Sequence, residues 1–134
     1  MARLLKATGK EEAALAAYHR AVDILNPIRY EYSVGYQGRH HSFRDSVAPL
    51  FMELEDLLLR RAAVADTPDQ TQQLLVQVKN IVEAERVAEL QDYLRDDCVA
   101  TARAWRGASD PLPKDTAVLY PIILTDRLEL LVET

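Results

Sequence analysis

The sequence has few residues that form cross-links or phosphate-binding loops, and it has no long hydrophobic run. Its one cysteine, Cys98, cannot form an internal disulfide, so nothing points to secretion. Its four glycines are isolated and build no glycine-rich phosphate loop. No apolar stretch approaches the roughly 20 residues of a membrane span, and the N-terminal MARLLKATGK is not a signal peptide. We therefore expect a cytoplasmic protein.

Positive charge is also scarce. The chain has 16 basic and 21 acidic residues, a net charge of −5, and no basic face. This balance argues against nucleic acid and anionic membranes as partners. With 134 residues, 49% of them hydrophobic and 28% charged, the composition is that of one ordinary globular domain with a real core.

The segment ATGKEEAALAAYHRAVDILNPIR has the periodicity of an amphipathic helix. Alanines keep one face small, and Leu15, Tyr18 and Val22 supply bulk at helical spacing. We expect the helix to end at Asn26 and Pro27, because proline restricts the residue before it and donates no hydrogen bond.

The same segment resembles the second half of a tetratricopeptide repeat, in which small and large residues alternate so that helix pairs nest. The first helix of the repeat would be reduced to the residues around Leu4 and Leu5. No second copy follows about 34 residues later, so the chain is not a solenoid by itself. An ordinary amphipathic helix remains the alternative.

A second helix is predicted to run through VAPLFMELEDLLLRRAAV. The residues from Gly35 to His41 form a connector before it, Ser42 is a plausible cap, and Pro49 falls in the first turns, where proline is tolerated. The apolar stripe of this helix comprises Leu50, Leu54, Leu57 or Leu58, and Arg61.

Acidic residues surround that stripe. We expect Glu53, Glu55 and Asp56 to lie on a solvated helix face and to pair with Arg60 or Arg61. The acidic run after Leu94, RDD, is interpreted in the same way, with Arg95 as its partner.

The segment DTPDQTQQ is the clearest helix start in the chain. Thr67 is the predicted cap, Pro68 takes the first helical position, and Gln70 stands where a capping box places Glu or Gln. A long helix follows, and RGASDPLPKD after it is a loop with one glycine and two prolines. The apolar positions of the helix are Leu74, Val78, Ile81, Val87, Ala88, Leu90 and Leu94.

The last segment, DTAVLYPIILTDRLELLVET, changes to the period of β-strands. Leu128, Leu130 and Val132 alternate with Glu129, Leu131 and Glu133. Thr125 and Asp126 form the predicted turn, and Pro121 belongs on an edge or at a bulge. The fold class is therefore mainly α, with antiparallel helices over 1–115 and a C-terminal β-hairpin over 116–134.

Few residues could carry chemistry. Cys98 with His40, His41 or His19 is the one combination that could make a thiol nucleophile. The preceding acidic pair would raise the pKa of the Cys98 thiol, and helical spacing favours a buried structural cysteine. Adjacent histidines point apart, and no second ligand set has zinc spacing. We predict no catalytic, cofactor-binding or metal-binding residue, and no cofactor.

Taken in order, the pieces resemble the junction of bacterial proteins that join tetratricopeptide repeats to a CHAT domain, a caspase-like domain related to separase. The resemblance runs roughly from Gly9 to Thr134, and ELQDYLRDDC followed by TAVLYPIILTDRLELLV is its most specific part. It implies that the hairpin holds the first CHAT strands. The catalytic His and Cys of the family lie downstream of those strands, so no residue here matches them.

The resemblance implies a non-catalytic segment that couples a repeat-type sensor to a cysteine protease, with the CHAT domain of its own parent chain as a partner. A free-standing helical adaptor and a thiol enzyme that uses Cys98 are the alternatives. A two-stranded hairpin is marginal alone in water. We therefore predict that it packs back on the long helix or pairs with another copy to form a dimer.

Overall fold

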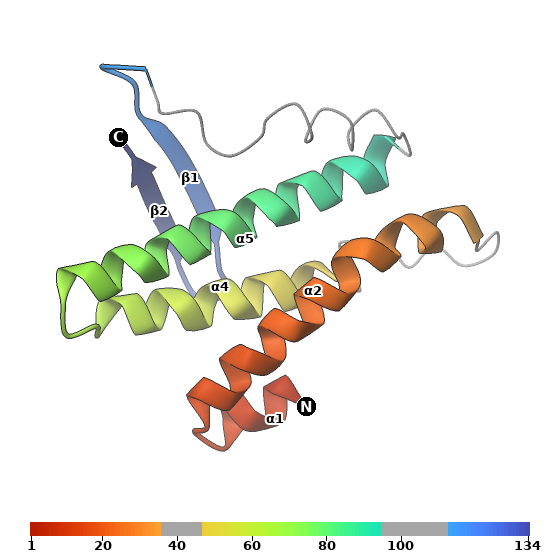
Figure 1. Cartoon of the computed structure of the whole chain (residues 1–134), viewed down its shortest axis with the longest axis horizontal. Coiled ribbons are helices and arrows are strands. Elements are labelled where there is room, and N and C mark those ends of the chain that lie inside the picture. The colour runs from red at the N-terminus through yellow and green to blue at the C-terminus, as the bar shows by residue number, and fades with distance from the viewer. Residues whose placement is uncertain (36–46, 95–112) are drawn as a thin grey trace.

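The computed structural model describes residues 1–35, 47–94 and 113–134, with side chains in the two long helices described up to Leu25 and Leu90. These residues form four helices and one antiparallel β-hairpin (Figure 1), which confirms the predicted fold class. The elements are α1 (Ala2–Ala7), α2 (Glu11–Gly35), α4 (Ala48–Ala63), α5 (Pro68–Leu94), β1 (Val118–Ile123) and β2 (Leu128–Glu133).

Helix α1 is short and packs beside the start of the long helix α2 at the N-terminus. Gly9 turns the chain between them with a φ of 72°, a backbone conformation that suits glycine. Tyr18 and Val22 on α2 are buried, as their helical spacing predicts. The expected end of the helix at Asn26 was wrong, because α2 continues through Pro27 to Gly35. A proline inside a helix removes one backbone hydrogen bond but does not forbid continuation.

Helices α4 and α5 form the antiparallel centre of the fold (Figure 1). Pro49 lies in the first turn of α4, as predicted. The predicted cap at Thr67 is confirmed, because the backbone N–H of Gln70 donates to its Oγ1 at 3.3 Å and α5 begins at Pro68. The predicted cap at Ser42, and the predicted connector apart from its first residue, lie outside the described residues.

One core joins α2, α4, α5 and β1, and Leu5 of α1 and Leu131 of β2 pack against its edge. Side chains from α2, α4, α5 and the hairpin meet in it, and Phe51 and Leu54 of α4 are fully buried. The predicted stripe of α5 holds at Val78, Ile81 and Ala88 but not at Leu90, which is half exposed. The other buried members are Ala14, Leu15, Tyr18, Val22, Leu57, Leu58, Val82, Ala84, Tyr120, Ile122 and Leu124.

The hairpin packs on α5, which was one of the two predicted arrangements. It crosses the α4–α5 pair steeply in Figure 1. Its register pairs Val118 with Glu133 at the open end and Ile123 with Leu128 beside the turn. The predicted turn at Thr125 and Asp126 is confirmed, because the N–H of Leu124 donates to the carbonyl of Arg127 at 2.9 Å.

Candidate interaction surface

The inner face of the hairpin, which lies against the helices, combines apolar and charged side chains. Tyr120 and Ile122 of β1 are buried there. The inward positions of β2 are Glu129, Leu131 and Glu133, all half-buried. The leucine-rich set of β2 is therefore the one that faces away from the core.

The outer face consists of apolar side chains in all three of its cross-strand pairs. These pairs are Leu119 with Val132, Pro121 with Leu130, and Ile123 with Leu128. Apart from the exposed Pro121, each side chain keeps between 50% and 74% of its surface accessible. Monomeric proteins rarely leave a contiguous apolar surface of this kind, and such patches mark interaction sites. We call these six residues the outer hairpin face.

Tyr120 anchors the inner face to α5. Its hydroxyl lies 3.1 Å from Glu83 Oε1 and 3.1 Å from Glu133 Oε2, so its single proton is shared between two carboxylates. Burial, and then the hydrogen bonds to these carboxylates, raise the pKa of Tyr120. The guanidinium of Arg86 lies 5.4 Å from the centre of its ring, within cation–π range.

Glu133 completes this anchor through an ion pair with Lys79 of α5. The hydrogen bond from Lys79 is the main reason that the pKa of Glu133 is lowered. The end of β2 is thus tied to the same helix as the middle of β1. Tyr120 and Glu133 on the inner face thus both have polar partners, whereas the outer hairpin face carries only apolar side chains.

Asp56 of α4 connects three elements. Its carboxylate accepts hydrogen bonds from Lys6 of α1 at 3.0 Å, Arg60 of α4 at 2.8 Å and Arg127 beside the hairpin turn at 2.8 Å. Burial alone would raise its pKa, but the hydrogen bonds from these three cations outweigh it and lower the pKa of Asp56 to about 2. The predicted pairing with Arg60 is confirmed, and two further partners are added.

Glu53 makes a similar link one turn earlier on α4. It accepts hydrogen bonds from Arg3 of α1 at 2.8 Å and from the hydroxyl of Tyr18 of α2 at 2.6 Å. The N-terminal helix pair α1–α2 is therefore held to α4 by two carboxylates, Glu53 and Asp56, and the second of these also holds the hairpin.

Glu55 corrects the prediction of a solvated acidic face. It is only 2% exposed, because it shares a stripe of α4 with buried Phe51 and Leu58, and its Oε1 has no hydrogen-bond partner. Burial, followed by repulsion from Glu85 of α5, raises the pKa of Glu55 to about 8. At neutral pH this carboxyl group is therefore mainly protonated between the two helices.

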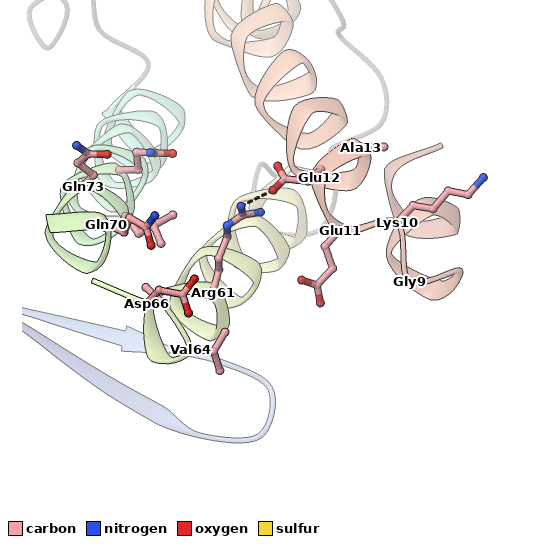
Figure 2. Close-up of a pocket in the computed structure, with 13 residues that line it drawn as sticks. Gly9, Lys10, Glu11, Glu12, Ala13, Arg61, Val64, Asp66, Gln70 and Gln73 are labelled. Atoms are coloured by element: carbon pink, nitrogen blue, oxygen red, sulfur yellow. Dashed lines mark hydrogen bonds and ion pairs between the residues drawn. The ribbon is translucent and has the colours of Figure 1, made fainter. Parts of the chain in front are cut away.

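A groove of about 830 Å³ opens between the start of α2 and the α4–α5 turn (Figure 2). Gln70, Gln73 and Gln77 line it along α5, and an ion pair between Arg61 and Glu12 crosses it. Its lining mixes both charges with amides and converges on no nucleophile–base pair among the described residues. We find no chemistry that this groove is built to perform.

The residues considered for thiol chemistry are not brought together in the described part of the chain. Cys98, His40 and His41 lie outside it, as does Arg95. His19 is half-buried on α2. Within 1–35, 47–94 and 113–134, no three His, Cys, Asp or Glu side chains are placed to hold a metal ion. No helix in those ranges is long and apolar enough for a membrane span.

Comparison of the chain with protein-family models, curated proteins and solved structures finds no match. The surface must therefore be interpreted from its own geometry. Sequence reasoning expected an apolar face on the hairpin but did not say which side chains form it, and it missed the position of Asp56. A signal for these side chains was present, since Leu119, Ile123, Leu128, Leu130 and Val132 are apolar at alternating strand positions. No local signal identifies Asp56, two of whose partners are 50 and 71 residues away.

Proposed function

We propose that this chain is a non-catalytic interaction and coupling segment. Its helical part connects to tetratricopeptide-type repeats, and its hairpin joins the caspase-like CHAT domain of the same parent protein. The resemblance of ELQDYLRDDC and TAVLYPIILTDRLELLV to that junction suggests the parent. The cytoplasm is the compartment that we expect for it.

The outer hairpin face is the observation that carries this proposal. Three successive cross-strand pairs expose only apolar side chains, whereas the charged side chains of β2 are turned inward. Complete burial of an exposed leucine, isoleucine or valine side chain contributes roughly 1.5–3 kcal/mol. A protein layer that covers this face therefore stabilises the assembly. A second layer of protein, such as further structure of a caspase-like domain, supplies that cover.

The coupling part of the proposal rests on the ion pairs of α4. Lys6 of α1 and Arg127 beside the hairpin turn share the carboxylate of Asp56, so displacement of α1 removes one of the cations that hold it. Rigid elements joined through shared polar contacts transmit a shift only when they have two arrangements. The proposal accordingly predicts two positions of the hairpin relative to α1, selected by the repeats.

The first experiment determines the reading frame beyond Thr134 and expresses the downstream sequence as a separate polypeptide. We expect an open frame that encodes more strands and, later, a His and a Cys. Titration calorimetry should then detect binding of that polypeptide to this chain. A stop codon directly after Thr134 would contradict the proposal and favour a free-standing adaptor.

A pair of variants locates the binding surface. Ile123→Glu places a charge on the outer hairpin face, and Val64→Glu places one on another exposed apolar residue, at the end of α4. We expect Ile123→Glu to weaken binding at least tenfold, which corresponds to about 1.4 kcal/mol, and Val64→Glu to leave it unchanged. Equal affinity for both variants would rule out the hairpin as the docking surface.

The non-catalytic part has its own test. The rate at which Cys98 reacts with a thiol reagent should follow an ordinary or raised thiol pKa and should show no acceleration near neutral pH. A fast reaction that depends on His40 or His41 would instead support the thiol enzyme.

A further inference from the structure

The two strands of the hairpin meet one row of side chains on α5, about one helical turn apart. The hydroxyl of Tyr120 on β1 lies 3.1 Å from Glu83, and Glu133 on β2 pairs with Lys79, which stands one turn earlier on the helix. A helical turn rises about 5.4 Å, close to the spacing of about 4.8 Å between neighbouring strands. The row therefore advances by about one turn for each strand of the sheet.

The same row continues past the hairpin. The start of α5 extends beyond the β2 edge on the inner side of the hairpin (Figure 1). Val76 is the next member of the row, since residues three or four apart share a helix face, and 45% of its surface is exposed. Within the described ranges the sheet has two strands, and neither lies over Val76. The helix is therefore long enough to support one strand more than the hairpin supplies.

The backbone of β2 is suited to pair with such a strand. The hydrogen bond from the Leu124 N–H to the Arg127 carbonyl fixes a hydrogen-bonded pair at the turn, and in an antiparallel ladder such pairs alternate with non-hydrogen-bonded ones. The register then makes all three pairs of the outer hairpin face non-hydrogen-bonded. The N–H and C=O groups of Leu128, Leu130 and Val132 consequently point toward the open edge of β2.

The opposite edge of the hairpin is less suitable. On β1 the outward positions are Leu119, Pro121 and Ile123, and Pro121 has no N–H to offer at the centre. The three outward residues of β2 include no proline, so that edge presents a complete row of donors and acceptors. A further strand therefore fits at β2 rather than at β1.

We propose that an extended strand of a partner protein adds to the β2 edge, antiparallel, and packs on Val76 of α5. Its central residue lies opposite Leu130, and three hydrogen-bonded pairs form, each of which exchanges two bonds. In this mode of recognition main-chain hydrogen bonds give affinity, and alternate side chains give specificity. The sheet then has three strands, which meets the requirement for independent stability.

The neighbouring side chains define the chemistry of the strand. Its outward side chains are apolar, because they extend the outer hairpin face. On the inner side, the residue opposite Leu131 is apolar because it packs on Val76. The residue opposite Glu129 is lysine or arginine, since 41% of the Glu129 side chain is exposed and opposite charges on neighbouring strands attract. The partner strand thus alternates apolar residues with one basic residue on the inner face.

The strand carries no helix on its inner side, because the start of α5 and the end of α4 already lie there (Figure 1). For the same reason a second copy of this chain cannot pair through its own β2. The proposed function uses the outer hairpin face, whereas this site uses the β2 edge and α5. Strand binding is measured on this chain with a peptide, and docking is measured with the downstream polypeptide, so the two proposals can fail separately.

A synthetic peptide of seven residues is the probe. It has threonine at both ends, lysine at the fifth position, opposite Glu129, and valine elsewhere. In an NMR titration from micromolar to millimolar peptide, the amide signals of the three outward residues of β2 should shift, and those of Leu119 and Ile123 should not. The same peptide with glutamate in place of lysine should bind roughly threefold more weakly or worse, because like charges then meet.

Two proline variants test the edge. Leu130→Pro removes the central outward N–H of β2, and Leu119→Pro removes an outward N–H of β1. Neither position donates to the hairpin ladder, and both leucines are similarly exposed, at 58% and 56%. Leu130→Pro should raise the dissociation constant of the peptide roughly tenfold or more, because a central hydrogen bond is lost and a buried carbonyl loses its donor. Leu119→Pro should change it little.

Two lysine variants test the contact with α5 without relying on a proline. Val76→Lys places a charge beneath the added strand, and Val64→Lys places the same charge on another exposed valine, at the end of α4. Val76→Lys should weaken peptide binding roughly tenfold, because the charge must be desolvated or displaced, and Val64→Lys should leave it unchanged.

Three results would overturn the proposal. The first is an absence of shifts along β2 at every peptide concentration. The second is equal sensitivity to both prolines, since the peptide would then lie on the outer hairpin face or on the helices. The third is a loss of binding in Leu130→Pro without a loss in Val76→Lys, because the strand would then pair with β2 without packing on α5.

Discussion

The two faces of the hairpin share one backbone, yet among the described residues only the inner face has partners for its side chains. On the inner face Tyr120 and Glu133 are held by groups of α5, and Ile122 is buried in the core. On the outer face Ile123 and Leu128 form an apolar cross-strand pair, and both side chains are exposed to solvent. The inner face fixes where the hairpin sits, and the outer face is left to be covered.

Two neighbouring residues of α4 repeat this contrast. Asp56 has three cationic partners and a lowered pKa, whereas Glu55 is buried with one unpaired oxygen and a raised pKa. Helical spacing separates them, because adjacent residues of a helix project about 100° apart. The carboxylate of Asp56, with its three partners, thus stabilises the fold at neutral pH, whereas the carboxyl group of Glu55 makes the stability of the fold depend on pH.

The largest effect is expected at Glu55. Its pKa in the folded state, about 8, lies above the ordinary 4.5, so the folded chain binds this proton more tightly than the unfolded chain. The free energy of unfolding is therefore highest below the unfolded pKa and falls as pH rises from the ordinary value toward 8, by roughly 4 kcal/mol in total. Urea unfolding at several pH values measures this fall. Glu55→Gln should remove most of it, and the exposed Glu11→Gln should not; an unchanged pH profile in Glu55→Gln would contradict the assignment.

The next effect compares two adjacent isoleucines of β1. Ile122 is 3% exposed on the inner face and Ile123 is 74% exposed on the outer face. Ile122→Ala should lower the free energy of unfolding by about 3 kcal/mol, because it leaves a cavity between sheet and helices. Ile123→Ala should change it by no more than about 0.5 kcal/mol. Denaturant unfolding measures the free energy of unfolding of both variants. A similar loss in the two would show that the outer hairpin face is already covered in solution.

A smaller effect is expected at Asp56. Its lowered pKa means that its stabilising effect is present above the ordinary value of 3.8 and is lost as pH falls through about 2. Asp56→Asn should cost about 2 kcal/mol at neutral pH, since three cations lose their common acceptor. Asp126→Asn is the matched control, because exposed Asp126 also pairs with Arg60 and Arg127. Urea unfolding of both variants measures the difference, and a loss at Asp126 as large as that at Asp56 would refute the special position of Asp56.

The smallest effect is expected for Tyr120→Phe. The ring keeps its burial and its contact with Arg86, while the hydroxyl shared by Glu83 and Glu133 is removed. We expect a loss of about 1 kcal/mol in the free energy of unfolding. Thermal unfolding should show this loss as a lowered melting temperature. A gain in stability would mean that the three-group arrangement is strained.

Much of the fold could be predicted from local patterns. The start of α5 followed from Thr67 and Pro68, and the hairpin followed from alternation and a predicted turn at Thr125 and Asp126. Prediction from local sequence failed at the end of α2, because the preference of proline for a helix end is weak enough for the rest of the helix to override it. Proline ends many helices, yet α2 continues past Pro27 to Gly35.

The candidate surface was less accessible to sequence reasoning. β1 is apolar at nearly every position, and β2 sets Leu128, Leu130 and Val132 against Glu129, Leu131 and Glu133, so the alternation identifies two faces without saying which one points inward. The face with Glu129 and Glu133 points inward because these residues form ion pairs there with Arg127 and with Lys79 of α5. Glu55 escaped notice for a related reason. It stands four residues after Phe51 and three before Leu58, but its charge was taken to mean exposure.

Pro121 also limits what can happen at one edge of the hairpin. It stands at the centre of β1 opposite Leu130 and has no N–H to offer to a further strand. Open-ended addition of strands to an intact apolar edge leads to fibres. A single residue without an N–H thus protects the β1 edge from such addition, and its replacement by a β-branched residue should make the chain more prone to aggregate.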